Sequence, residues 1–442
     1  MTNGQGLVPS SAGALSRGVL LIGAGVLLLV GTLTISAVTA PAIGTSGHDA
    51  QLKRTLVGSQ GGGTGWHQYG SIYLLNGSDV AWREDSADSY FDVTKTENGT
   101  ILAGFMNGGY DACGPYDSPC TRTGVRAIDP QPIPRVIGEY GIPVRTNKNS
   151  EVHDVERLDS GEVLLTDMDN ERIFAVEDGE VTWQWNASSF YDAPDDPTTT
   201  DWLHINDVDA ISEQRYLVSV RNANQLLVVE RGAGVVEVIN EDRSNENDGN
   251  CRQSGQLRDT DGDGDVRCGD PSTLSHQHNP QWLGENAVLV ADSENGRVVE
   301  LHNRSGEWTV AWQLQEAGGV GLYWPRDADR LPNGNTLVTD TLNRRVVEVN
   351  ESGAVVWSYE TERIPYEADR LPAGESIGGP TYSDAGTDTR RTDSDIPLLS
   401  PLLVGIQAVY PSLPIWFDEP QLLLTLVSLG CVLSGMVARF RE

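Results

Sequence analysis

The sequence predicts an all-β fold, a six-bladed β-propeller, with one transmembrane helix before it and one after it. A unit with a polar first residue recurs along the chain: HDVERLDSGEVLLTD from His153, NDVDAISEQRYLVSV from Asn206, HNPQWLGENAVLVAD from His278 and RDADRLPNGNTLVTD from Arg326. Each unit reads as four short strands separated by turn residues, and four strands in roughly 50 residues are typical of a propeller blade. Apolar stretches near both termini are long enough to cross a bilayer as helices.

The first apolar stretch has no charged residue from Gly18 to Gly47, and its segment from Val19 to Ala40 can span a hydrocarbon core. We therefore expect residues 1–17 to be a cytoplasmic N-terminus and residues 18–40 to be a transmembrane anchor. The run Ala-Val-Thr-Ala at positions 37–40 suits a signal peptidase, so a cleaved signal peptide is the alternative. Both alternatives export the central domain.

The propeller is expected over residues 65–378. The third strands of its blades are expected to start near Ile72, Val125, Ile173, Leu226, Val298 and Val346, which gives six blades. The first segments, GSIYLLN and DVAWRE, look like a third and a fourth strand, whereas the last segment, YEADRLPAGESI, looks like a first and a second. We expect these two half-blades to complete each other, because closing the ring removes exposed sheet edges.

The C-terminal region is expected to form a linker over residues 379–397, an interfacial segment over residues 398–417 and a transmembrane helix over residues 421–438. Trp416 and Phe417 precede this helix, and Arg439 and Arg441 follow it. Aromatic side chains suit a membrane interface, and arginine favours the cytoplasmic side. The sequence thus predicts a cell-membrane protein with both termini in the cytoplasm and the propeller on the extracellular side.

The charge of the chain is strongly negative. It has 63 acidic against 31 basic side chains, a formal charge of −32, and its acids are spread through strand-like segments rather than gathered in blocks. Such a surface stays soluble in salt that screens ordinary charge repulsion, so we interpret it as halophilic. The same charge excludes nucleic acid as a partner.

Cysteines and glycosylation sequons agree with export. Cys113 and Cys120 lie close together in a Gly/Pro-rich loop, and Cys251 and Cys268 bracket another loop, so two local disulfides are expected. Sequons for N-glycosylation begin at Asn76, Asn98, Asn186, Asn303 and Asn350. We expect them to carry surface glycans.

Alignment of the blades places polar residues at the mouth of the central channel, because the first strand of each blade is innermost and residues two apart share one side of an extended segment. These mouth residues are Phe91, His153, Asn206, His278, Arg326 and Tyr366, preceded two positions earlier by Ser89, Glu151, His204, His276, Trp324 and Ile364. Four of the seven histidines of the chain lie in this set. Such a lining favours function over mere packing.

The run DWLHINDVDA from Asp201, a strand ending SVR at Arg221, HD at His153 and QH at His278 resemble the bacterial arylsulfate sulfotransferase family over roughly residues 65–375. Members of that family are six-bladed propellers that move a sulfuryl group between phenols without a nucleotide sulfate donor. The resemblance implies that His278 is a nucleophile that forms a sulfohistidine. It also implies that a set of polar residues holds the sulfuryl oxygens: His153, His204, Asn206 and Arg221.

These residue types suit the implied chemistry. A neutral imidazole is available as a nitrogen nucleophile near its unperturbed pKa of about 6.5, and a covalent intermediate divides one hard displacement into two easier ones. Arg221 offers a planar fork of donors to anionic oxygens. A phenol has a pKa of about 10, so a histidine that donates and accepts its proton is useful in both half-reactions. No cofactor is expected for catalysis.

The expected partners are a small aryl sulfate donor, a hydroxyl acceptor and the membrane. The chain lacks the additional N-terminal β domain of the better-known bacterial enzymes, which leaves the acceptor open among a phenol, a lipid and a surface glycan. Residues expected to line the channel and bind substrate are Arg326, Trp324, Tyr366 and His276.

An acidic run in the long insertion before His276 has the spacing of a calcium loop, so it is either a structural calcium site or an acid-rich loop of a halophilic surface. Its ligands would be Asp259, Asp261, Asp263, Asp265 and Asp270. Two other function classes stay open. One is a metal-dependent lyase or hydrolase with zinc on His153, His204 and His278, and the other is a non-catalytic adhesion or ligand-binding propeller.

Overall fold

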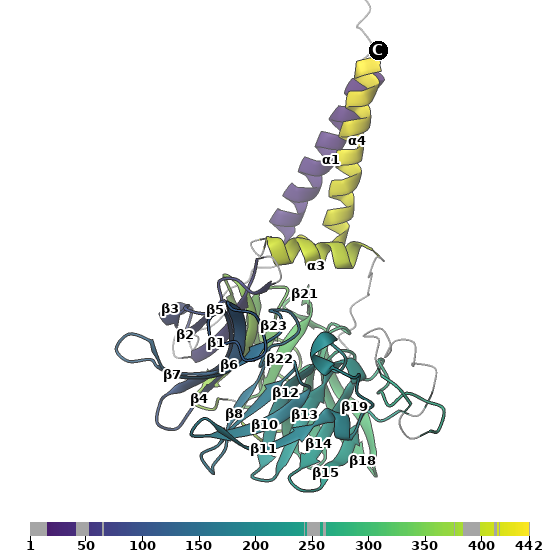
Figure 1. Cartoon of the computed structure of the whole chain (residues 1–442). Helices are drawn as coiled ribbons and strands as arrows, with labels where there is room; N and C mark the ends of the chain where they lie inside the picture. The colour runs from purple at the N-terminus through teal and green to yellow at the C-terminus, as the bar shows by residue number, and fades with distance from the viewer. Residues whose placement is uncertain are drawn as a thin grey trace, which may run out of the picture. The chain divides into compact units, whose positions relative to one another are not determined.

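The computed structural model describes residues 16–40, 53–63, 66–242, 244, 257–259, 262–374, 376–382, 398–410, 413–414 and 416–441. These residues form two compact units, one built from helices and the other from β-sheets. Each unit is described by itself (Figure 1).

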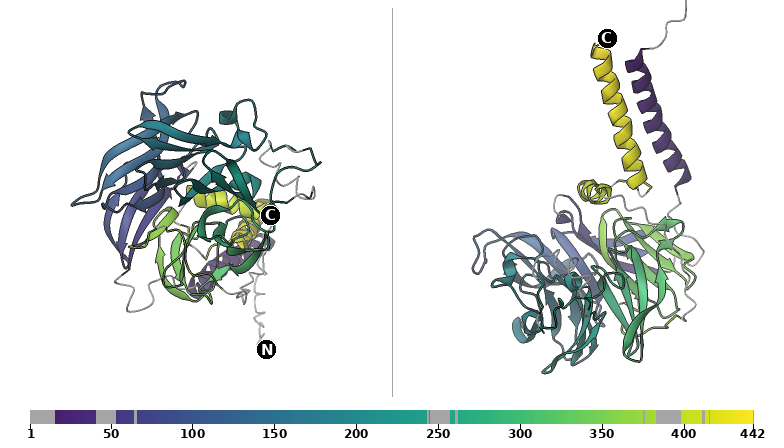
Figure 2. Two further views of the ribbon diagram at one scale, coloured as in Figure 1. Left: turned by 90° about the horizontal axis from the view of Figure 1, so that it is seen from below. Right: turned by 90° about the vertical axis from the view of Figure 1, so that its right-hand side faces the viewer.

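The β unit is a six-bladed propeller of four-stranded antiparallel sheets (Figures 1 and 2). Blade 1 contains β4 (Ser89–Lys95), β5 (Ile101–Tyr110), β6 (Cys120–Asp129) and β7 (Arg135–Val144). Blade 2 contains β8 (Val155–Arg157), β9 (Val163–Asp167), β10 (Arg172–Glu177) and β11 (Glu180–Asn186). Blade 3 contains β12 (Ile205–Ser212), β13 (Arg215–Val220), β14 (Gln225–Glu230) and β15 (Gly234–Ile239). Blades 4 and 5 contain β16 (His278–Gly284), β17 (Ala287–Asp292), β18 (Arg297–Arg304), β19 (Glu307–Leu314); and β22 (Pro325–Arg330), β23 (Thr336–Asp340), β24 (Arg345–Val349), β25 (Val355–Glu360). A small hairpin of β20 (Glu316–Ala317) and β21 (Val320–Gly321) joins them.

Blade 6 closes the ring with strands from both ends of the domain. It has the order β26 (Ile364–Leu371), β1 (Arg54–Gly61), β2 (Ser71–Asn76) and β3 (Asp79–Glu84). The first strands of successive blades contact one another around the whole circle, from β26 through β4, β8, β12, β16 and β22 back to β26. The expected third strands are present as β2, β6, β10, β14, β18 and β24, so the six-bladed fold is confirmed.

Two details of the closure differ from the prediction. The N-terminal end of the domain supplies three strands and the C-terminal end supplies a single strand, rather than two each, and the propeller starts at Arg54 rather than at residue 65. The physical reason lies after β26, where Pro372 and Gly374 stop the strand. The edge of β26 is then free for β1, which pairs with it from Arg54 to Gly61.

The core lies between adjacent blades, where the sheet faces pack on each other. Blades 2 and 3, for example, bury Ile173, Trp185, Val208 and Tyr216 in one apolar cluster. Because side chains alternate along a strand, these apolar side chains point to the faces of the sheets, between the blades. The innermost strand of each blade lines the central channel.

Carboxylates directly after the mouth residues join neighbouring blades. Each accepts a hydrogen bond from a backbone N–H on the next innermost strand: Asp92 from Val155 at 3.2 Å, Asp154 from Val208 at 2.7 Å and Asp327 from Ala368 at 3.0 Å. The repeat therefore places an acidic side chain at a fixed position to link one blade to the next.

Asp207 departs from this arrangement. The corresponding residue of the next blade is Pro280, which has no N–H to donate. Asp207 is buried, and its Oδ2 has no hydrogen-bond partner in the described region of the chain. Burial, together with the charge of Asp154, raises the pKa of Asp207 well above its usual value.

The helical unit contains α1 (Arg17–Thr39) and α4 (Glu419–Arg441), which Figure 1 shows side by side, and α3 (Leu399–Val409) as far as Gly405. The two long helices are antiparallel. A Cβ atom added to Gly18 would lie 2.7 Å from the carbonyl oxygen of Gly435, and one added to Gly25 would lie 2.7 Å from that of Ser428. Glycine thus permits the close approach of the helices, as in packed membrane helices.

Both long helices have the length and composition of a membrane span, which by itself does not distinguish an anchor from a signal sequence at the N-terminus. Their antiparallel packing brings Arg17 to the same end of the pair as Arg439. The segment expected at the interface contains α3, and residues 383–397 of the expected linker lie outside the described residues.

The disulfide between Cys113 and Cys120 is present, and Cys431 is a free thiol in α4. Cys251 lies outside the described residues, so its pairing with Cys268 stays a prediction.

Candidate active site

The fold brings the mouth residues into contact although they come from six different blades. His153 stacks on Tyr366 with ring centroids 5.1 Å apart, and it lies 4.9 Å from Phe91 and 5.6 Å from His204. His278 lies 6.3 Å from Tyr366 in an edge-to-face arrangement. All of these except His204 are buried.

The residues two positions before three of the mouth residues have a left-handed backbone. The φ angles of His204, His276 and Trp324 are 58°, 48° and 54°. This conformation is uncommon for residues other than glycine and costs of order 1–3 kcal/mol. Residues in such strained conformations are often found at functional sites. The same bend in blades 3, 4 and 5 supports the alignment of the repeats, although no sequence pattern predicts it.

The imidazole of His278 is oriented by a hydrogen bond at Nδ1. Its Nδ1 lies 2.8 Å from Ser293 Oγ, and that hydroxyl donates to the carbonyl oxygen of Pro325 at 2.6 Å. Ser293 Oγ must then accept from His278, which places the proton on Nδ1. The lone pair of the imidazole is therefore on Nε2.

His278 is also kept neutral. Burial lowers its pKa well below the ordinary value, and the positive charges of Arg326 and Arg221 lower it further. No carboxylate is among the causes of the shift. A neutral imidazole with a lone pair on Nε2 can attack an electrophile.

His204 has a carboxylate partner instead. Its Nδ1 lies 2.8 Å from Asp201 Oδ1. Burial raises the pKa of Asp201, but the charge and hydrogen bond of His204 bring it below the ordinary value. Such a pair stabilises an imidazolium and leaves Nε2 to exchange a proton. His204 is thus suited to acid–base work.

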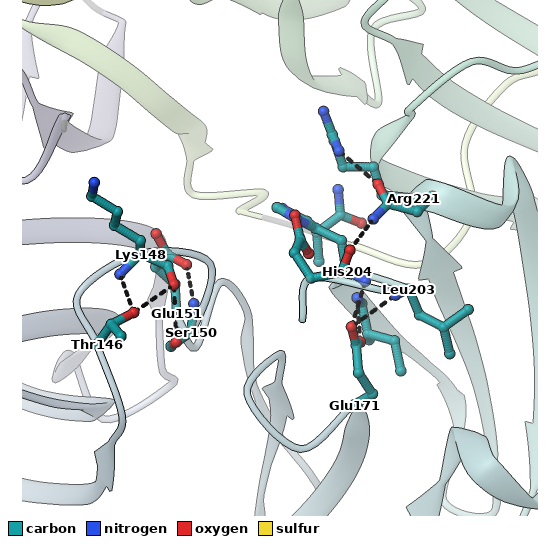
Figure 3. A network of polar contacts seen from close by, with 12 residues as sticks. Thr146, Lys148, Ser150, Glu151, Glu171, Leu203, His204 and Arg221 are labelled. Carbon is teal, nitrogen blue, oxygen red and sulfur yellow. Dashed lines mark hydrogen bonds and ion pairs between the residues drawn. The ribbon is translucent and has the colours of Figure 1, made fainter. Parts of the chain in front are cut away.

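The backbone that carries His204 is held by Glu171. The carboxylate of Glu171 accepts hydrogen bonds from the N–H groups of Leu203, His204 and Ile205 at 2.9, 2.6 and 3.0 Å, as Figure 3 shows for the first two. Burial raises the pKa of Glu171 to about 8 despite these bonds. The N–H of Arg221 donates to the carbonyl oxygen of His204 at 3.4 Å, which joins the two predicted site residues.

Arg221 and His276 lie near one acid, Glu294. Glu294 Oε1 is 3.8 Å from Arg221 Nη2 and 3.6 Å from His276 Nδ1. Both distances are longer than a good hydrogen bond, so Glu294 compensates the positive charge of Arg221 without a direct hydrogen bond to its guanidinium.

Arg326 is enclosed by aromatic rings. Its guanidinium carbon lies 5.4, 4.9 and 5.1 Å from the ring centroids of Trp66, Trp324 and Tyr366, and its Nη1 donates to Gln60 Oε1. Burial lowers its pKa to about 10, so Arg326 remains a cation at neutral pH.

Several buried polar atoms in the mouth have no hydrogen-bond partner among the described residues. They are His153 Nδ1, Asn206 Oδ1, Trp324 Nε1, Arg326 Nε and Tyr366 Oη. Unpaired polar groups cost free energy when buried, and five at one place indicate a site built for a polar ligand or for water.

Sequence reasoning missed five residues that shape the site. Asp201 stood out only as the first letter of the motif DWLHINDVDA, and Ser293, Glu294, Trp66 and His67 carried no signal that distinguished them from loop residues. The last two come from the loop between β1 and β2, which the predicted propeller boundary only partly included.

The calcium loop remains a prediction, because Asp261 lies outside the described residues. Asp259 accepts hydrogen bonds from the N–H groups of Gly262 and Gly264 at 2.8 and 3.0 Å, and Asp263, Asp265 and Asp270 are present in the same insertion. For zinc, no three histidine, cysteine or acidic side chains within the described ranges gather as a metal site. His153, His204 and His278 are all among these described residues, and they are not grouped as a metal site.

The chain resembles known proteins over parts of its length. No curated protein sequence matches the chain. Among solved structures, a protein of unknown function from Bacteroides caccae aligns with a TM-score of 0.48 at 15% identity, over 72% of this chain and 99% of its own. A catalytically inactive virginiamycin B lyase from Staphylococcus aureus, with quinupristin, aligns with a TM-score of 0.39 at 10% identity, over 71% and 82%. A periplasmic gluconolactonase from Pseudomonas aeruginosa aligns with a TM-score of 0.40 at 13% identity, over 72% and 98%.

A family model described as Arylsulfotransferase (ASST) matches residues 174–362, from β10 in blade 2 to the end of blade 5. This range includes His204, Asn206, Arg221 and His278, whereas His153 precedes it. The resemblance to arylsulfotransferases drawn from the sequence is therefore confirmed over residues 174–362, which lie within the six-bladed propeller.

Proposed function

We propose that the protein transfers a sulfuryl group from an aryl sulfate ester to a phenolic or other hydroxyl acceptor, in two steps through a sulfohistidine at His278. The observation that carries this proposal is the state of His278, a neutral imidazole whose Nδ1–H is fixed by Ser293. Its free Nε2 belongs to a cluster that holds two guanidinium groups and several unpaired polar atoms.

In the first step, Nε2 of His278 attacks sulfur and forms an N–S bond. The S–O bond to the aryl group breaks, its electron pair stays on the phenolic oxygen, and the proton of His204 Nε2 neutralises that oxygen. In the second step the acceptor gives its proton to His204 while its oxygen attacks sulfur, and the electrons of the N–S bond return to His278. Both steps balance without a cofactor.

The sulfuryl oxygens need positive charge and hydrogen-bond donors. Arg221, Arg326 and His153 can supply donors, and the amide of Asn206 is fixed through Nδ2, which donates to the carbonyl oxygen of Gln277 at 2.9 Å. A preorganised set of this kind stabilises charge that develops on the oxygens during transfer. The ring of Trp324, which is only partly buried, suits an aryl donor or acceptor.

We further propose that α1 and α4 anchor the protein in the cell membrane, with the propeller on the extracellular side and both termini in the cytoplasm. The arginines at one end of the antiparallel helix pair support this orientation. An epitope at the C-terminus should be protected from a protease added to intact cells, whereas the propeller should be cleaved. Cleavage of both would contradict this topology.

The transfer reaction can be tested with the full chain in detergent at high salt. After incubation with 4-nitrophenyl sulfate, mass spectrometry should find one added SO3 group on the peptide that contains His278. His278→Ala should abolish the label, and Arg221→Lys should slow its formation by at least about tenfold, as for loss of a bidentate transition-state contact. His302→Ala is the matched control, because His302 pairs with Glu300 on β18, the third strand of blade 4. Absence of any label, or equal labelling of His278→Ala, would favour a binding propeller without catalysis.

A further inference from the structure

We propose that Gln60 is a positioning residue that holds Arg326 with a neutral amide, and that the guanidinium of Arg326, which has no acidic partner among the described residues, anchors the sulfate group of the donor. This inference rests on the proposed function and deepens it. It adds strand β1 to the site, and it assigns the binding of the anionic donor to Arg326 rather than to Arg221.

Arg326 differs from the other buried arginines in its charge balance. The described residues include six buried arginines: Arg126, Arg326, Arg330, Arg344, Arg345 and Arg370. Each of the other five has a carboxylate oxygen 2.7 to 3.7 Å from a guanidinium nitrogen. In the described part of the chain no ion pair joins Arg326 to an acid, and a buried charge without a partner is costly. An anionic ligand supplies the missing charge.

Neutral groups surround the guanidinium instead. The rings of Trp66, Trp324 and Tyr366 lie around it, and its Nη1 donates a hydrogen bond to Gln60 Oε1. Because arginine offers only donors, Gln60 presents its carbonyl oxygen and not its NH2 group. Aromatic faces and an amide oxygen attract a cation but leave its charge unbalanced. The Nε of Arg326 has no hydrogen-bond partner within the described ranges, so one donor of this cation is still unused.

The backbone of β1 fixes where Gln60 points. The pairing of β1 with β26 shifts at this residue, since Ser59 and Gly61 pair with adjacent residues of β26 and Gln60 is passed over. Such a β-bulge redirects a side chain, and bulges are frequent beside active sites. The hydroxyl of Ser89 donates to the carbonyl oxygen of Gln60 at 3.0 Å, which ties the bulge to the neighbouring blade. Gln60 is therefore held at both its backbone and its side chain.

Arg326 contacts the same aromatic ring as the candidate nucleophile. Its guanidinium carbon lies 5.1 Å from the ring centroid of Tyr366, and that ring stacks on His153 at 5.1 Å and lies 6.3 Å from the ring of His278. Burial lowers the pKa of His278, and among the charged groups Arg326 lowers it most. A sulfate group on Arg326 would therefore lie in the cluster that contains the attacking nitrogen.

Arg221 is less suited to the role of anchor. Glu294 lies 3.8 Å from its Nη2, and its Nη1 donates to Asn222 Oδ1 at 2.7 Å. The negative charge of Glu294 weakens the attraction of Arg221 for an anion. Arg326, with no acid this close, should contribute mainly to the binding of the donor.

A carboxylate in place of the amide should remove the anchor. Gln60→Glu keeps the length of the side chain and can still accept from Arg326, but its negative charge neutralises the guanidinium. The Kd for inorganic sulfate and the KM for 4-nitrophenyl sulfate should each rise about tenfold or more, as expected for the loss of a charge-assisted contact. The value of kcat should fall by less than about threefold, because the contact is made in both the ground state and the transition state. Gln60→Met removes the acceptor without adding a charge and should raise both constants about threefold.

Isothermal titration calorimetry measures the binding of inorganic sulfate without any transfer. The full chain is used in detergent, at a fixed high concentration of chloride, and denaturant unfolding in the same buffer separates affinity from folding. A merely structural Gln60 would change the unfolding and leave the sulfate affinity unchanged.

Gln184→Glu is the matched control and should leave both constants unchanged. Gln184 lies on β11, the fourth strand of blade 2, and its Oε1 also accepts from an arginine, since Arg172 Nη1 donates to it at 2.7 Å. That arginine already pairs with Asp167, so the control adds the same charge at an arginine that is not an anion anchor.

An unchanged Kd for sulfate in folded Gln60→Glu protein, or no sulfate binding by the wild type, would overturn the inference. If Gln60→Glu does not fold, Gln60→Met decides in its place, and an unaltered sulfate affinity would then refute the role of Gln60. Failure of His278 to become labelled in the wild type, while sulfate binding still depends on Gln60, would instead remove the proposed function and leave only an oxyanion site.

Discussion

Asp154→Asn should change how the stability of the propeller depends on pH. Asp154 is buried at the start of blade 2 and links it to blade 3 through the N–H of Val208. Burial raises its pKa to about 7 from an ordinary value of 3.8, and the neighbouring Asp209 contributes to the rise. Asparagine can accept the same hydrogen bond through Oδ1 but cannot ionise.

The size of the effect follows from linkage. Below pH 3.8 the carboxyl of Asp154 is protonated in both the folded and the unfolded chain. As the pH rises above this value, the carboxyl lowers the stability of the fold, because the unfolded chain releases the proton first. The interval from 3.8 to about 7 corresponds to at most about 4 kcal/mol, at about 1.4 kcal/mol for each pH unit. Above a pH of about 7 the loss is complete and constant.

The assay is denaturant unfolding of the full chain in detergent at fixed salt, from about pH 4 to about pH 8. We expect wild type and Asp154→Asn to have similar free energies of unfolding at about pH 4, and the variant to be more stable by up to about 4 kcal/mol at about pH 8. Asp79→Asn, at an exposed position of β3, should follow the wild type. Parallel curves for wild type and Asp154→Asn would refute the assignment of a raised pKa to this group.

Two predictions concern the nucleophile. Ser293→Ala removes the acceptor that holds the proton on His278 Nδ1. The lost hydrogen bond, which orients the imidazole, is worth about 1 kcal/mol, so sulfohistidine formation should slow about three- to tenfold. Stopped-flow assays with 4-nitrophenyl sulfate measure this rate. An unchanged rate would mean that Ser293 does not set the tautomer. The lowered pKa of His278 predicts that the nucleophile stays unprotonated below pH 6.5, so the acid limb of the labelling rate should fall below that pH. A half-maximal rate at or above pH 6.5 would contradict the buried, neutral state.

Much of the site could be predicted from the chain because the repeat is regular. The spacing places Asn206, His278 and Arg326 on innermost strands and His153 two residues before one. In the structure His153, His278 and Arg326 all lie against Tyr366. Strand alternation has a period of two, so an alignment correct to one residue also predicts which side chains face the channel. The same regularity predicted all six third strands.

The chain closure could not be predicted in the same way. β1 has the sequence RTLVGSQG, which lacks the polar first residue and turn signals of the repeat, and only its pairing with β26 makes it a strand. The loop after it brings Trp66 and His67 to the mouth, against Arg326 and Glu151. Neither side chain differs in sequence from an ordinary loop residue.

The sequence by itself determined the number of blades, the two apolar helices and the identity of the residues at the mouth, because these depend on periodicity and composition that are local. Tertiary structure alone decided the tautomer of His278, the carboxylate partner of His204 and the pairing of Glu151 with His67. Proton position and charge depend on burial and on atoms within about 3 Å of each other. Those neighbours come from strands and loops far apart along the chain, which only the closed ring brings together.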